Sequence, residues 1–180
     1  MPKFAAMALS TFFLSLASGT LAASAADVVA PVKEVMDATA ANWAGGDSEW
    51  QDLFGPDKLN HLYSKDFIAK YEAASKFPAV DDDGISPFDY DVIVQGQDAC
   101  PLEDVTIKPG TPANGKTEVI AQFKKQTCMG TDAANQAFSV VRFEVLEEDG
   151  KPVIDDILTV DENGKDSSLK ETMDSIVKQQ

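Results

Sequence analysis

The chain is poor in basic residues and in histidine. Its 180 residues include 15 Lys and Arg against 30 Asp and Glu, and the formal net charge is −15. A nucleic-acid-binding protein needs a basic face that releases counterions from a polyanion, and this composition excludes that class. An anionic lipid surface is disfavoured for the same reason. The one histidine, His61, excludes a metal site built on two imidazoles.

The sequence also lacks the short motifs of several enzyme classes. It contains no G-x-S-x-G elbow, Walker-type loop, dinucleotide-binding glycine motif or H-E-x-x-H pair. We therefore expect no cofactor and no metal. What the sequence does have is 44% hydrophobic residues over a length typical of one domain, which is enough to build a single core.

The amino-terminal segment is typical of a secretory signal peptide. Lys3 precedes an uncharged apolar stretch at 4–16, and small residues follow at 22–26. A membrane anchor is the alternative, but the stretch is short of the ~20 residues that span a bilayer and no basic cluster follows it. The sequence predicts a signal peptide over 1–25 and a single domain over 26–180, periplasmic or secreted, with no membrane span after cleavage.

The two cysteines, Cys100 and Cys128, agree with export, because an even number in an oxidising compartment favours a disulfide. Asn114-Gly115 lies midway between them and is a strong hairpin-turn dipeptide. A hairpin that pairs 105–108 with 116–126 would bring the two sulfurs together at its open end. A redox-active pair needs the close Cys-x-x-Cys spacing, so we expect a structural disulfide.

The first half of the domain has helical periodicity. Apolar spacing predicts a helix over about 30–44, with Pro31 at its first position. Residues 48–51 have the S-x-x-Q form of a capping box, which predicts a short helical turn. Asp57 and Ser64 are candidate N-caps of two further helices.

In the second half the apolar period becomes two, which predicts antiparallel strands. The last two strands, over about 138–145 and 153–160, are joined by a tight turn at Asp149-Gly150. Ser168 opens a second capping box and a closing amphipathic helix. Helices, then a sheet, then a helix predict an α+β domain with its helices on one face of an antiparallel sheet.

An acidic loop separates the two halves. Its aspartates are Asp81, Asp82, Asp83, Asp89 and Asp91. Calcium binding is the alternative to a solvated loop, but the twelfth position counted from Asp81 is Val92, where an EF-hand loop needs a glutamate. We interpret the loop as a docking surface for a protein partner with a basic patch. An inhibitor whose acidic loop covers a basic enzyme site is a weaker variant of this hypothesis.

A second group of carboxylates lies in the last predicted strand and before the first cysteine. Strand alternation predicts that one of Asp155 and Asp156 is partly buried. A buried carboxylate is either a general base with a raised pKa or an acceptor of backbone N–H groups, and the structural role is favoured. Asp98 has the same ambiguity, with turn capping as its structural role.

Several short segments resemble a bacterial domain family of unknown function. They are Tyr63-Ser64-x-x-Phe67, Pro87-Phe88, Gln97-Asp98, Asp149-Gly150, Ile154-Asp155-Asp156-Ile157 and Ser168-Leu169-Lys170. The resemblance implies an exported or lipid-anchored envelope protein with a nuclear transport factor 2-like fold, in which helices and a curved sheet surround a pocket. The chain departs from the family at Ser86, where an acidic residue is usual, and at Pro152, where a tryptophan is usual.

These observations favour two hypotheses. The first is an exported, non-catalytic interaction module of the cell envelope. The alternative is a binder of a small apolar ligand, or an enzyme, that uses the cone pocket of the fold. In the alternative, the polar groups converging on the pocket are Tyr63, Tyr90, Asp98, Asp155 and Asp156. A cone filled by side chains such as Phe123, Phe138 and Phe143 would count against it.

Overall fold

The computed structural model describes residues 25–46, 49–79, 86–160 and 165–179. This part of the chain forms four α-helices and a five-stranded sheet, which confirms the predicted α+β class. The helices are α1 (Ala25–Asn42), α2 (Pro56–Leu62), α3 (Lys65–Ala74) and α4 (Leu169–Lys178), with a 3-10 turn η1 (Thr127–Met129). The strands are β1 (Glu103–Pro109), β2 (Lys116–Lys124), β3 (Ser139–Glu148), β4 (Lys151–Val160) and β5 (Asp166–Ser168). The predicted signal peptide, apart from residue 25, lies outside the described residues.

The sheet is an antiparallel meander in the order β1-β2-β3-β4-β5. Asn114-Gly115 joins β1 to β2, and Asp149-Gly150 joins β3 to β4. All four of these turn residues have positive φ, between 53° and 79°, as two-residue hairpin turns require. Both predicted hairpins are confirmed. The three-residue β5 was not predicted, because its sequence is too short to show a period.

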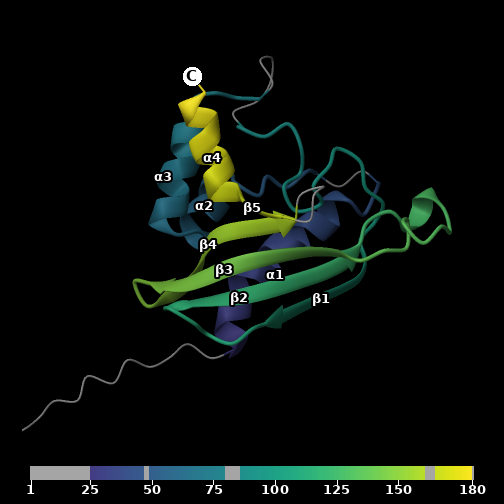
Figure 1. Cartoon of the computed structure of the whole chain (residues 1–180), viewed down its shortest axis with the longest axis horizontal. Coiled ribbons are helices and arrows are strands. Elements are labelled where there is room, and N and C mark those ends of the chain that lie inside the picture. Colours follow the sequence, from purple (N-terminus) through teal and green to yellow (C-terminus); the bar gives the residue numbers. More distant parts are fainter. Residues whose placement is uncertain (1–24, 47–48, 80–85, 161–164, 180) are drawn as a thin grey trace, which may run out of the picture.

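Helix α1 lies behind the sheet, and α2, α3 and α4 are grouped beside β4 and β5 (Figure 1). α1 contacts β1 through β4, and its Val32, Val35 and Met36 are fully buried in the same core as Phe123 and Phe143. These side chains fill the sheet face that a cone pocket would need. Phe138 is not among them: it precedes β3 and is 53% exposed.

The amino-terminal helix is longer than predicted. It begins at Ala25, so Pro31 lies inside α1 and not at its first position. Three of the six helical residues before the proline are alanine, the residue with the highest helix propensity, which favours the extension of the helix in that direction.

Of the two short helices α2 and α3, only α3 begins at its predicted N-cap. Ser64 caps α3 as predicted, because its Oγ accepts a hydrogen bond from the Phe67 N–H at 3.1 Å. The prediction for Asp57 is wrong: Gly55 is the N-cap of α2, and Pro56 occupies the first helical position that suits its fixed φ.

The capping box at 48–51 does not begin the helical turn predicted over 50–54, and Leu53 and Phe54 lie in a turn that is not helical. Ser48 lies outside the described residues, and residues 49–52 have no helical structure. The side chain of Asn42 instead holds the backbone of Gln51, accepting from its N–H at 2.7 Å and donating to its carbonyl at 2.9 Å. This pair of hydrogen bonds fixes the segment before α2 against the end of α1.

The carboxy-terminal helix begins as predicted. The Oγ of Ser168 accepts a hydrogen bond from the Glu171 N–H at 3.1 Å. Leu169 and Met173 of α4 are buried. None of the described helices is both long enough and apolar enough to cross a membrane.

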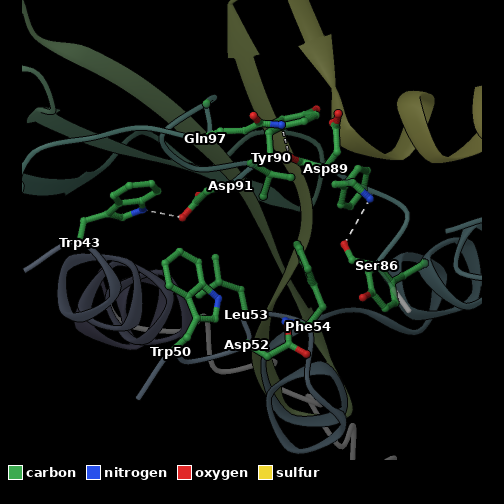
Figure 2. Close-up of a pocket in the computed structure, with 14 residues that line it drawn as sticks. Trp43, Trp50, Asp52, Leu53, Phe54, Ser86, Asp89, Tyr90, Asp91 and Gln97 are labelled. Atoms are coloured by element: carbon green, nitrogen blue, oxygen red, sulfur yellow. Dashed lines mark hydrogen bonds between the residues drawn. The ribbon is translucent and has the colours of Figure 1, made fainter. Parts of the chain in front are cut away.

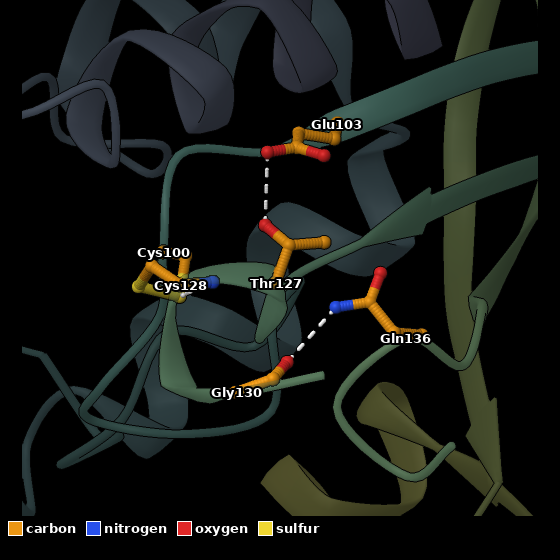
Figure 3. The surroundings of a disulfide bond; sticks show 6 residues. All are labelled: Cys100, Glu103, Thr127, Cys128, Gly130 and Gln136. Carbon is orange, nitrogen blue, oxygen red and sulfur yellow. Dashed lines mark hydrogen bonds between the residues drawn. A yellow bond between two sulfur atoms is a disulfide. The ribbon is translucent and has the colours of Figure 1, made fainter. Parts of the chain in front are cut away.

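The disulfide between Cys100 and Cys128 is present and closes the open end of the β1–β2 hairpin, as predicted (Figure 3). The Cα atoms are 5.7 Å apart, within the range for a bridge. The Cys100 N–H also donates to the Lys125 carbonyl at 2.8 Å, which continues the pairing of the two segments beyond β1 and β2. The Thr127 hydroxyl donates to Glu103 at 2.9 Å across the same junction.

We expect removal of this bond to destabilise the fold. The double variant Cys100→Ser/Cys128→Ser should lower the free energy of unfolding in urea by about 3 kcal/mol, because the unfolded chain regains the entropy of an open loop. Reduction of the wild type should reproduce the loss, and the variant should not respond to reductant. A loss below about 1 kcal/mol would show that the bond adds little to pairing already made by the strands.

Candidate functional site

Asp155 and Asp156 lie at a β-bulge in β4. Glu144 of β3 pairs with Asp156 and the next residue, Val145, pairs with Ile154, so Asp155 is an extra residue on β4. The bulge breaks the strand alternation, and Ile154 and Ile157 both enter the core although they are three positions apart. The prediction that alternation buries one carboxylate is therefore wrong: both are buried.

The carboxylate of Asp155 accepts from three side chains. Ser64 Oγ lies 2.7 Å and Lys170 Nζ 3.1 Å from its Oδ1, and Lys116 Nζ lies 2.7 Å from its Oδ2. Burial by itself raises the pKa of Asp155, but the hydrogen bonds from Lys116, Ser64 and Lys170 outweigh it and hold the pKa below its ordinary value. Asp155 is therefore held as a carboxylate.

Asp156 faces mostly neutral donors. Its Oδ2 accepts from Ser168 Oγ at 2.5 Å, and its Oδ1 accepts from the backbone N–H groups of Ile157 at 2.8 Å and Lys170 at 3.1 Å. Burial raises the pKa of Asp156 above its ordinary value, and these hydrogen bonds only partly oppose the rise.

The two carboxylates fasten two helices to the sheet. Ser64 and Ser168 are the N-caps of α3 and α4, and each donates its hydroxyl proton to one aspartate while accepting from its own helix. Ser64 N–H also donates to the Ile154 carbonyl at 2.9 Å. Neither aspartate lines the cleft or the cavity described below. This arrangement supports a structural role for the pair.

Replacing Asp155 tests this role through pH. The folded-state pKa lies below the unfolded value of about 3.9, so ionisation of Asp155 stabilises the fold above that value, and the stabilisation is lost as pH falls through the folded-state pKa. We expect Asp155→Asn to lower the free energy of unfolding by about 2 kcal/mol at neutral pH, because Lys116 and Lys170 lose their shared buried carboxylate and keep only their second partners, Glu144 and Asp66. Urea denaturation across acidic pH should show this difference narrowing below about pH 4.

Asp149→Asn is the matched control, because Asp149 pairs with Lys65 at 2.7 Å on the exposed surface. It should change the neutral-pH stability little, since exposed ion pairs are screened. A difference between Asp155→Asn and the wild type that stays constant from neutral to acidic pH would contradict the role assigned to the charge.

An open cleft of about 790 Å³ lies between the end of α1, the segment before α2, α3 and the segment 86–97 (Figure 2). Its lining residues come from four parts of the chain that the core brings together. They are Trp43, Trp50, Asp52, Leu53, Phe54, Tyr71, Ser86, Phe88, Asp89, Tyr90, Asp91, Val92, Gly96 and Gln97. Six of these are aromatic.

Phe54 is the centre of the aromatic wall. Its ring centroid lies 4.9 Å from that of Tyr71, 6.0 Å from that of Phe88 and 5.9 Å from that of Phe67. Tyr90 extends the row, with its ring centroid 6.1 Å from that of Phe88. Phe54, Tyr71 and Phe88 are buried and Tyr90 is 38% exposed, so the row runs from the core to the cleft mouth.

The two tryptophans form the other wall. Trp43 Nε1 donates to Asp91 Oδ2 at 2.8 Å, which fixes the indole at the end of α1 (Figure 2). Trp50 packs edge-to-face against it, with ring centroids 5.7 Å apart and an interplanar angle of 81°. Trp50 is 57% exposed, an unusual position for the largest apolar side chain.

Asp91 is a structural part of this cleft as well as an acidic group. Its Oδ1 accepts from the backbone N–H groups of Ile93 at 2.8 Å and Val94 at 3.1 Å, so the aspartate caps the turn that follows it. Asp89 is exposed at the rim, and its carbonyl accepts from the Gln97 side chain at 2.8 Å. Asp81, Asp82 and Asp83 of the predicted docking loop lie outside the described residues.

A second cavity of about 420 Å³ shares Tyr90 and Val92 with the cleft. It is lined on its other sides by β4, β5 and α4, including the hydroxyl-bearing residues Thr159, Ser167 and Thr172. The segment 90–92 therefore forms a boundary between two hollows.

The five polar residues proposed for a cone pocket do not lie together. Tyr90 lines the cleft, and Asp155 and Asp156 meet at the bulge. Tyr63 is buried, with its hydroxyl donating to the Leu53 carbonyl at 3.2 Å, and burial raises its pKa far above the ordinary value. Asp98 is exposed and is not a lining residue.

Sequence reasoning missed the tryptophans and Phe54 as site residues. Trp43 matches the apolar spacing of the predicted helix, and Trp50 and Phe54 match the apolar spacing of the short helical turn predicted after it. All three were therefore interpreted as core residues. The available signal was that both tryptophans of the chain lie within eight positions of each other, in a stretch that also carries Asp47, Glu49 and Asp52.

Among the described residues, no group of three or more His, Cys, Asp or Glu side chains is placed to hold a metal ion. Comparison of the chain with protein-family models, with curated proteins and with solved structures finds no match.

Proposed function

We propose that the protein is an exported, non-catalytic binding module that holds its ligand in the aromatic cleft. The observation that carries this proposal is the cleft itself, an open hollow of about 790 Å³ with two tryptophans and four further rings in its wall. Ligand sites typically occupy about 300–1,000 Å³ and combine apolar walls with a few polar groups. This binding role keeps the small ligand of the alternative hypothesis but moves it from the cone pocket, whose sheet face is covered by core side chains, to the cleft, and joins it to the exported, non-catalytic module of the first hypothesis.

The cleft is organised for binding before any ligand enters. Trp43 is fixed by Asp91, and Phe54 is held by its stacked neighbours and by its own N–H, which donates to Asp52 at 2.8 Å. Rigid rings lose little conformational freedom when a ligand packs on them, so more of the interaction energy remains as affinity. Trp50 and Tyr90 supply exposed ring surface that a ligand would bury.

A non-catalytic role is supported by the position of the buried carboxylates. Asp155 and Asp156 are the buried acidic groups of the described residues, and their oxygens are used in the fold outside the cleft. Export is supported by the disulfide, which is typical of oxidising compartments. The nuclear transport factor 2-like identity belongs to the same proposal, supported by helices packed on an antiparallel sheet.

A protein partner with a basic patch is the second candidate. Asp52, Asp89 and Asp91 lie around the cleft and give its rim one sign of charge. Complementary charge of this kind steers association and selects partners.

A neutral fluorescent probe tests the cleft as a binding site. Nile red should bind in a saturable manner, and Trp50→Ala should weaken that binding about ten-fold, because the variant removes the exposed aromatic wall. Phe138→Ala is the matched control, since Phe138 is 53% exposed but does not line the cleft. Equal loss in the two variants, or no saturable binding by the wild type, would contradict the proposal.

A further inference from the structure

The charge of the cleft has a single sign. Its lining residues include Asp52, Asp89 and Asp91, and among the 14 there is no Lys, Arg or His. Tyr71 and Tyr90 add no charge at neutral pH, because burial raises the pKa of each phenol above its ordinary value and, for Tyr90, Asp89 adds to the rise. A ligand in the cleft therefore meets carboxylates and neutral rings.

The aromatic rings, like the carboxylates, favour a ligand with positive charge. The face of an aromatic ring carries negative potential and its edge positive potential, and tryptophan attracts a cation most strongly. The polar edge of Trp43 is already occupied, because its Nε1–H donates to Asp91. The ring planes of Trp50 and Trp43 lie at 81° to each other, so the two indoles form two adjoining walls of one corner of the cleft (Figure 2).

The three carboxylates of the cleft have two roles: Asp91 holds neighbouring groups in place, and Asp52 and Asp89 lie exposed at the rim. Asp91 is engaged through both oxygens, by Trp43 and by the turn at Ile93 and Val94. Asp52 and Asp89 are exposed, and Asp52 uses Oδ1 to accept from Phe54. The rim groups supply charge that a ligand can approach directly.

Lys125 is a cation near Asp91 that does not line the cleft. Lys125 interacts electrostatically with Asp91, but it is half-buried, is not a lining residue, and donates its ammonium to the Val94 carbonyl. Lys125 offsets part of the charge of Asp91, and the charges of Asp52 and Asp89 remain.

We infer that the cleft binds a small organic cation, an ammonium or guanidinium group carried on an apolar body. This inference rests on the proposed binding function and names its ligand class. The apolar body packs on Phe54, Phe88 and Tyr90, and the cationic group lies between the indoles and the acidic rim. A free small molecule is favoured over a protein side chain, because a volume of about 790 Å³ is that of a site for a whole small ligand.

A charge series on one ring tests the inference. Benzyltrimethylammonium, benzyl alcohol and phenylacetate share a phenyl group and carry positive, zero and negative charge. Both tryptophans of the chain line the cleft, so intrinsic tryptophan fluorescence reports binding there without a label. We expect the cation to bind at least about ten-fold more tightly than the alcohol, and phenylacetate to bind most weakly.

Two variants separate charge from shape. Asp52→Asn/Asp89→Asn should weaken the cation about five-fold and leave benzyl alcohol unchanged, because asparagine keeps the size and the acceptor oxygen but loses the charge. Asp132→Asn is the control, an exposed aspartate outside the cleft. The affinity for the cation should also fall with added salt, which screens exposed charges.

The outcomes distinguish the ligand class from the binding function. Equal affinities across the charge series would overturn the cation inference and leave the cleft a binding site. No response to any of the three compounds, together with no saturable Nile red binding, would overturn both. A lysine-rich peptide that binds while benzyltrimethylammonium does not would overturn the small-molecule ligand in favour of a basic protein partner.

Discussion

The bulge of β4 is the constraint on which the positions of α3 and α4 depend. One extra residue in the strand places two adjacent carboxylates, Asp155 and Asp156, beside the N-caps of two helices. Lys116 and Lys170 balance the charge that results at Asp155. Burying a charge costs free energy unless the charge is paired and hydrogen-bonded. The two aspartates therefore require α3 and α4 to begin beside the bulge of β4.

The position of α3 in turn determines the aromatic wall. Ser64 fixes the start of the helix on β4, and Phe67 and Tyr71, one turn apart, face the same side. Phe54 packs against both of their rings, and Phe88 continues the row toward the surface. The cleft is thus the place where the aromatic core reaches solvent. Its ring-bearing wall is held in position by packing within that core.

Sequence patterns predicted the features that have local causes. The hairpin at Asn114-Gly115 and the cap at Ser64 follow from residues within one turn of each other, and the disulfide follows from the hairpin. The bulge was not predictable, because it depends on the register between β3 and β4 and interrupts an alternation that looked regular. The cleft was missed for a similar reason: Trp43 and Asp91 are 48 positions apart and meet only in the folded chain.

The central claim is that the corner formed by the two indoles is the ligand site, and fluorine NMR tests it most directly. Protein labelled with fluorotryptophan should give two resonances, since the chain has two tryptophans. Titration with benzyltrimethylammonium should shift both resonances with one common dissociation constant, because Trp43 and Trp50 share a single cleft. Binding of the cation that leaves both resonances in place would locate the ligand elsewhere and contradict the account.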